Sequence, residues 1–239
     1  MHRRSFINLL GLSYAGSLLP HNFMNELYGN KNIKPVEGSW FEFQHHSIVE
    51  GKYWDSTLRN FTCDQWDRKV KEISEAGIKY LVLLDVAVYG KTFYPSSLLP
   101  KHQLACEDPL ETVLSAADKY GVNFFISNDF FGEWTNVDLM MKDKQVHSLR
   151  IRAMNEVAEK YSHHPSFYGW YFPNETAVDG HYRDFFISYV NSCSMEARRL
   201  TPAAKTLIAP YGTRLVKADD EFVKQLEKLD VSFIAYQDE

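Results

Sequence analysis

The chain has 239 residues, enough for one α/β domain or two small ones, and 45% of them are hydrophobic, which supports a buried core and excludes a disordered chain. The formal net charge is −5 and the Lys and Arg residues are scattered, so the basic stripe that nucleic-acid binding needs is missing. Aromatic residues make up 15% of the chain, which suits either a large core or a ligand with apolar faces and hydroxyl groups, such as a sugar.

The first 20 residues predict an export signal. Arg3 and Arg4 precede an apolar run that continues to Leu19, and together with Phe6 the arginine pair is similar to a twin-arginine signal. The run is too short for a stable membrane span. We therefore expect a protein exported to the periplasm or cell surface, with residues 21–38 as a polar linker. The alternative is a buried N-terminal helix.

From residue 39 onward, short apolar runs alternate with amphipathic stretches, a pattern typical of parallel βαβ construction. The expected strands are 39–44, 79–85, 122–128, 167–172, 205–210 and 231–236. Their starts recur at intervals of about 26 to 45 residues, which fits a repeated strand and helix with variable loops.

The stretches between these strands carry apolar residues at helical spacing, and we expect all of these faces to belong to the core. In chain order they are Trp66, Val70 and Ile73; Leu110, Val113, Leu114 and Ala117; Ile151, Met154, Ala158 and Tyr161; Phe185, Tyr189, Val190 and Cys193; and Phe222, Val223 and Leu226. Thr62 and Gln65 predict a capping box at the start of the first helix, and Gly77 predicts its end.

The order of elements predicts an α/β fold, a TIM-type (β/α)8 barrel spanning residues 39–239 and truncated after its sixth strand. No glycine-rich turn follows the first strand, so a nucleotide-binding doubly wound sheet loses its main support. Because an open sheet edge invites aggregation, we expect either two missing units, which we favour, or partners that complete the sheet.

Metal and cofactor sites are not indicated. Cys63, Cys106 and Cys193 show neither metal-ligand spacing nor a disulfide framework, and we expect buried or partly buried thiols. The adjacent residues His45 and His46 point in opposite directions on an extended chain. We therefore expect no metal and no cofactor, and the oligomeric state stays open.

Polar residues follow almost every predicted strand, at the barrel face where reactive groups gather. In strand order they are Gln44-His45-His46, Asp85, Asn128-Asp129, Asn174-Glu175, Tyr211 and Gln237-Asp238-Glu239. By contrast, His163 and His164 precede the fourth strand and lie on the opposite face, which favours a structural role.

The segment from Gly169 to Glu175, with Trp170 in the strand and Asn174 before the glutamate, resembles the fourth-strand motif of the large clan of retaining (β/α)-barrel glycosidases. The resemblance implies that Glu175 is the general acid/base and that Asn174 contacts the sugar 2-hydroxyl. Glycosidic cleavage needs a carboxylic acid that protonates the departing oxygen, which fits this assignment.

Residues 39–239 also resemble a family of exported barrel proteins, a domain of unknown function related to glycoside hydrolases. The shared features are Trp40-Phe41, Gly169-Trp170-Tyr171 with Glu175, and Gln237-Asp238. A weaker resemblance links residues 76–83 to the second strand of fucosidases, but Asp85-Val86-Ala87-Val88 stands where their His-His-Asp-Gly would follow.

We therefore expect a carbohydrate-active protein, a glycoside hydrolase with Glu175 as acid/base. The clan's nucleophile, a glutamate after strand seven, has no counterpart in this sequence, so the choice between a retaining and an inverting mechanism stays open. An inverting mechanism needs a base that activates water, and Asp238, Asp129 and Asp85 are the candidates, with Asp238 as the second expected catalytic residue. The expected substrate-binding residues are Trp40, Gln44, Asp85, Asn128, Asp129, Trp134, Tyr171, Asn174, Tyr211 and Gln237, with Tyr236 and Trp54 as further aromatic candidates. The alternative is a non-catalytic carbohydrate-binding or assembly protein on the same scaffold.

Overall fold

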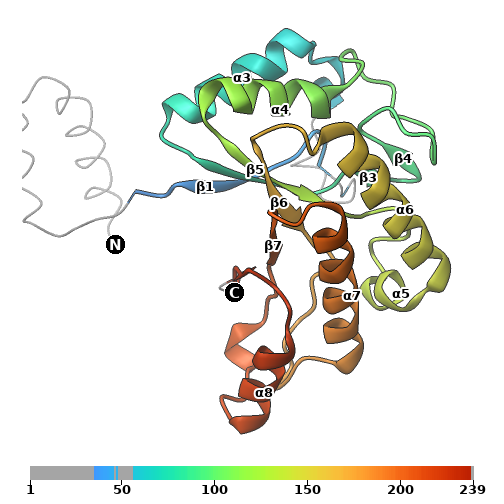
Figure 1. Cartoon of the computed structure of the whole chain (residues 1–239), viewed down its shortest axis with the longest axis vertical. Helices are drawn as coiled ribbons and strands as arrows, with labels where there is room; N and C mark the ends of the chain where they lie inside the picture. The colour runs from blue at the N-terminus through green and yellow to red at the C-terminus, as the bar shows by residue number, and fades with distance from the viewer. Residues whose placement is uncertain (1–34, 46, 48–55, 238–239) are drawn as a thin grey trace, which may run out of the picture. The chain divides into compact units, whose positions relative to one another are not determined.

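A parallel sheet of six strands organises the described part of the chain, residues 35–45, 47 and 56–237 of a computed structural model (Figure 1). Contacts divide the chain into Met1–Val36 and a compact unit, Glu37–Glu239, which carries all the elements below. The predicted export signal lies outside the described residues. Gly38, which we placed at the end of the linker, is the first residue of β1.

Each strand of the sheet pairs in parallel with the next one along the chain, in the order β1-β2-β5-β6-β7-β8. The strands are β1 (Gly38–Phe41), β2 (Tyr80–Leu83), β5 (Asn123–Ser127), β6 (Phe167–Tyr171), β7 (Lys205–Ile208) and β8 (Phe233–Ile234). Sequential order without a reversal is the order of a barrel rather than of a doubly wound sheet. The six strands curl into a half-barrel, which confirms the predicted truncated (β/α) barrel.

Helices connect the strands, as the apolar spacing predicts. They are η3 (Ser56–Asn60), α3 (Cys63–Glu75), α4 (Pro109–Tyr120), α5 (Val137–Lys142), α6 (Lys144–Tyr161), α7 (Asp184–Leu200), η4 (Thr213–Leu215) and α8 (Asp220–Lys228). The capping box of α3 is confirmed, since Thr62 and Gln65 bond each other's backbone N–H. Within the described residues, no helix combines the length and apolar character of a membrane span.

The two faces of the sheet bury different clusters, because side chains alternate along each strand. The outward side chains, such as Leu81, Leu83 and Trp170, pack with the helices in the main core. The inward cluster contains Phe125 and Tyr171 and is smaller. The inward face is partly open, since Trp40 on β1 is 46% exposed.

Two features between strands were not predicted. A hairpin of β3 (Ala87–Val88) and β4 (Lys91–Thr92) follows β2. Cys63 and Cys106 form a disulfide, so the prediction of free thiols was wrong for these two residues, and it is confirmed for the buried Cys193. The disulfide partners lie 43 residues apart and meet only because α3 packs beside α4, which spacing alone does not reveal.

The predicted core face of α8 is only partly correct, since Val223 is 52% exposed. Gln225 is buried instead. Its amide accepts a hydrogen bond from the Tyr182 backbone N–H and donates one to the Tyr182 carbonyl, both at 2.7 Å. On α8 a polar residue, Gln225, therefore faces inward and Val223 faces outward.

Candidate active site at the strand ends

Glu175 lies just beyond the carboxyl end of β6, at the barrel face where catalytic groups gather. One carboxylate oxygen accepts a hydrogen bond from the Tyr171 hydroxyl at 2.5 Å, and the other accepts one from the Gln237 amide at 2.5 Å. Gln237 also donates to the Ala209 carbonyl at 2.8 Å, which anchors it to the end of β7. The half-buried Glu175 carboxylate is therefore held in one orientation by donors from β6 and from the segment after β8.

Tyr171 is suited to this donor role. Its ring is fully buried, and burial together with the nearby charge of Glu175 raises the pKa of its hydroxyl well above the usual value. The hydroxyl therefore stays protonated and donates to Glu175 at all ordinary pH values. The Trp40 ring packs 5.2 Å from the Tyr171 ring, which places this exposed indole on the inner face beside the site.

A cavity of about 210 Å³ opens beside Glu175. Its lining residues are Leu84, Phe130, Trp134, Thr135, Val137, Pro173, Asn174, Glu175 and Tyr211. Most of this wall is aromatic or apolar, and among the described residues that line it Glu175 is the one carboxylate. Pockets for drug-sized ligands occupy roughly 300–1,000 Å³, so this smaller cavity suits a ligand the size of one sugar ring.

A larger depression of about 670 Å³ lies elsewhere, beside α6. It is lined by Ser97, Leu98, Arg152, Asn155, Glu156, Glu159 and Lys160, and no strand end contributes to it. Its Glu156 carboxylate already accepts hydrogen bonds from Tyr94, Ser96 and Ser97. The smaller cavity at the strand ends is the better candidate site, because it combines an oriented carboxylate with aromatic walls.

Asn174 belongs to a buried network behind the cavity. Its amide donates to the Asp129 carboxylate at 2.6 Å and to the Tyr189 hydroxyl at 3.0 Å. The same Asp129 oxygen accepts from Arg150 at 2.5 Å, and the other accepts from the Phe131 N–H at 3.0 Å. Asp129 and Arg150 are both fully buried. Burial lowers the pKa of Arg150, but the interactions with its neighbours, Asp129 foremost, together outweigh burial and raise that pKa. Asp129 therefore fixes the position of Asn174 from behind.

Asp85 and Gln44 follow β2 and β1 and are almost fully buried, yet their side-chain polar atoms have no hydrogen-bond partner within the described residues. Burial, reinforced by the nearby Glu42 charge, raises the pKa of Asp85 well above its usual value. Glu42 itself pairs with His45 at 3.1 Å. Neither Asp85 nor Gln44 lines the cavity.

Asp85 predicts an unusual pH dependence of stability. Because its pKa is raised in the folded state, the fold is favoured while Asp85 is protonated, and this advantage is lost as the pH rises through the folded-state value. Asp85→Asn should therefore raise the free energy of unfolding by about 1–2 kcal/mol at pH 8 and change it little at pH 4. Urea unfolding at both pH values measures this, with the exposed Asp179→Asn as control. An Asp85→Asn variant that loses stability, relative to the wild type, as the pH rises from 4 to 8 would contradict a raised pKa of Asp85 in the folded state.

The remaining predicted site residues fall into three groups. Trp134 and Tyr211 line the cavity, and their contact with a sugar stays a prediction. Asn128 is buried and its amide donates to a methionine sulfur of α6 at 3.6 Å, away from the cavity. Asp238, the predicted second catalytic carboxylate, and Trp54 lie outside the described residues.

Sequence reasoning missed two contributors to the site. Phe130 lines the cavity from the loop after β5, and no pattern singles it out among the many aromatic residues. Arg150, in contrast, could have been found from the sequence pattern. It lies one helical turn before Met154, on the face of α6 that is otherwise apolar and buried, and a charge in such a position implies a buried partner.

Comparisons with solved structures show the class of fold. The chain is similar to a candidate α-L-fucosidase from Bacteroides thetaiotaomicron, with a TM-score of 0.61 and 17% identity over 87% of this chain and 67% of that one. For a β-galactosidase from Marinomonas ef1 the TM-score is 0.55 and the sequence identity is 10%, over 86% of this chain and 41% of that one. For an endo-1,4-β-mannanase from Rhizomucor miehei the TM-score is 0.50 and the sequence identity is 9%, over 75% of this chain and 57% of that one. At these identities the likeness is one of fold, that of the (β/α)-barrel glycoside hydrolases.

The chain belongs to the family described as a domain of unknown function, DUF4434, whose model matches residues 36–239. This confirms the resemblance drawn from the strand motifs. The match covers the whole half-barrel, whereas the chain spans 67% of the fucosidase chain and less than two thirds of the other two. A search of curated proteins gives no match.

Proposed function

We propose that this protein hydrolyses a glycosidic bond in an oligo- or polysaccharide, with Glu175 as general acid/base. The observation that carries the proposal is the cavity at the strand ends, where an oriented carboxylate faces aromatic walls. Trp134 and Tyr211 offer a ring face and a hydroxyl to one sugar unit. The exposed Trp40 ring, packed on Tyr171, extends the aromatic surface along the inner face.

In this mechanism Glu175 in its protonated form donates to the departing glycosidic oxygen. Tyr171 and Gln237 act as positioning residues, because each holds one oxygen of the Glu175 carboxylate. The Asn174 side-chain oxygen has no hydrogen-bond partner within the described residues, so it can accept a bond from a sugar hydroxyl, while its amide stays fixed by Asp129.

The second carboxylate of the proposed mechanism is Asp238. It directly follows Gln237 in the sequence, and the Gln237 amide bonds Glu175, which supports the choice of Asp238. Asp129 is committed to its buried ion pair with Arg150, and Asp85 does not line the cavity. These contacts favour Asp238 over the two alternatives as the group that activates water.

Export to the periplasm or cell surface is part of the proposal. The Cys63–Cys106 disulfide supports it, because disulfides persist in oxidising compartments and are rare in the cytosol. Cell fractionation followed by thiol labelling measures this. A protein found in the cytosol with Cys63 and Cys106 reduced would contradict it.

A second candidate function is carbohydrate binding without turnover. The observation that favours it is the presence of a single carboxylate, Glu175, among the described residues that line the cavity. Inverting and retaining hydrolysis both need a pair of carboxylates. A site with one carboxylate and aromatic walls would still bind a sugar.

Binding is tested with a panel of monosaccharides and short glycans, and the readouts are the change in intrinsic tryptophan fluorescence and the rise in melting temperature. Trp134→Ala should weaken binding about tenfold, because it removes a stacking face worth about 0.5–1.5 kcal/mol together with its buried area. The matched control is Met195→Ala, a truncation of an exposed side chain on α7 away from the cavity. Binding that Trp134→Ala leaves unchanged would exclude this cavity as the sugar site.

A further inference from the structure

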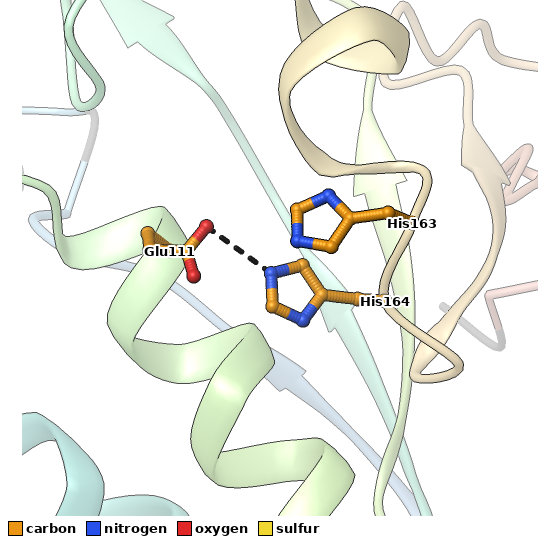
Figure 2. A group of neighbouring side chains, drawn as sticks. All are labelled: Glu111, His163 and His164. Atoms are coloured by element: carbon orange, nitrogen blue, oxygen red, sulfur yellow. Dashed lines mark hydrogen bonds and ion pairs between the residues drawn. The ribbon is translucent and has the colours of Figure 1, made fainter.

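Two histidines and a glutamate meet beside α4, where the chain approaches the start of β6. Glu111 lies in the first turn of α4, whereas His163 and His164 lie in the loop between α6 and β6. Potential ligand atoms of the three side chains all lie within 4.8 Å of one another. Figure 2 shows the two imidazole rings side by side, tilted by 36° to each other, with the Glu111 carboxylate next to the His164 ring.

The distances resemble those of a metal site. The His164 Nε2 atom lies 3.1 Å from a Glu111 carboxylate oxygen. Zn²⁺ binds nitrogen and oxygen at roughly 2.0–2.2 Å with tetrahedral geometry, which sets neighbouring ligand atoms about 3.3 Å apart. The His163 ring is exposed and its centroid lies 4.1 Å from that of His164. Because His163 is exposed, its ring can turn toward the other two ligand atoms without disturbing the core.

A second, independent feature is the partner of the other His164 nitrogen. The Nδ1 atom lies 2.6 Å from a carboxylate oxygen of Asp118, two turns along α4 from Glu111. The other Asp118 oxygen accepts from the Ser166 N–H at 2.8 Å, so this carboxylate is itself held in place. A histidine that ligates a metal through one nitrogen usually donates the other N–H to such a carboxylate, which fixes its tautomer and orientation.

We propose that Glu111, His163 and His164 bind one Zn²⁺ ion, with Asp118 orienting His164 and water completing the coordination. Two imidazoles and one carboxylate suit Zn²⁺, whereas Mg²⁺ and Ca²⁺ require mostly oxygen ligands. The ion joins α4 to the loop that leads into β6, the strand that carries Glu175 at its other end. Its role is structural, since it lies before the strand and not at the face where the cavity opens.

The test uses the full chain without a histidine tag, calorimetry with Zn²⁺, and thermal unfolding. We expect one ion per chain and a melting temperature that rises by about 5–10 °C at a hundredfold excess over Kd. His163→Ala, a change in an exposed side chain, should weaken Zn²⁺ affinity at least tenfold. Asp118→Asn should weaken it about 10–100-fold, because it removes the group that orients His164.

The matched control is His181→Ala, since His181 also pairs with an aspartate, Asp219 at 2.8 Å, but has no second histidine beside it in the described residues. Its Zn²⁺ affinity should equal that of the wild type. No binding by the wild type, or binding that survives both His163→Ala and Asp118→Asn, would overturn the proposal. In that case a proton on His164 Nε2, shared with Glu111, occupies the position that we assign to the metal.

Discussion

Glu175→Gln is expected to lower hydrolytic turnover by about 10²–10⁴-fold while the fold stays intact, because the amide cannot protonate a departing oxygen. The substitution keeps the shape of the side chain. An amide oxygen can still accept the Tyr171 hydroxyl, and Gln237 keeps its bond to the Ala209 carbonyl. Steady-state kinetics on a hydrolysed glycan, with far-ultraviolet circular dichroism of both proteins, measures this effect.

The control for this variant is Glu227→Gln, the same chemical change at an exposed position on α8. It should leave turnover within twofold of the wild type. Binding of the glycan by Glu175→Gln should persist, because Trp134 and Tyr211 still line the cavity. Turnover that survives in Glu175→Gln would remove this residue from the mechanism.

Arg150→Met should be the most destabilising single substitution of the site region, lowering the free energy of unfolding by about 3–5 kcal/mol. The arginine is fully buried and donates to Asp129 at 2.5 Å and to the Met140 carbonyl at 2.6 Å. Methionine fills a similar volume but leaves the Asp129 charge buried without its ion-pair partner. Urea unfolding at pH 7 measures the loss.

The double variant Arg150→Met with Asp129→Asn separates charge from packing. Because the second change removes the uncompensated charge, the double variant should be more stable than Arg150→Met alone. Stability of Arg150→Met within 1 kcal/mol of the wild type would show that the buried ion pair is not what holds this region.

The strands and helices follow from local sequence patterns, whereas the contacts within the site do not. The short apolar runs predict all six strands of the sheet, and the apolar residues at helical spacing predict the helices between them, because each pattern reflects local burial. The Thr62 capping box is equally local, and it is confirmed. Because each strand pairs with the next one along the chain, Glu175 lies just beyond the carboxyl end of β6, and this position could also be predicted from the sequence.

Hydrogen-bond partners that lie far apart in the chain could not be predicted from the sequence, because they depend on how the helices and strands pack. Gln237 meets Glu175 across 62 residues, and Arg150 meets Asp129 across 21. Asp129 and Asn174 both follow strands and were both expected to contact substrate, yet only Asn174 lines the cavity, and Asp129 accepts a hydrogen bond from the Asn174 amide instead. Position at a strand end predicts which face a residue occupies but does not predict which neighbour takes its hydrogen bonds.

The central claim is that the cavity beside Glu175 is the active site of a glycoside hydrolase. The most direct measurement is the release of reducing sugar from a panel of plant and host glycans by the purified protein and by Glu175→Gln, assayed side by side. We predict release by the wild type from at least one glycan and loss of that release in the variant. Equal release by both proteins would contradict the assignment of Glu175, and stabilisation by a glycan without any release would establish a binding protein instead.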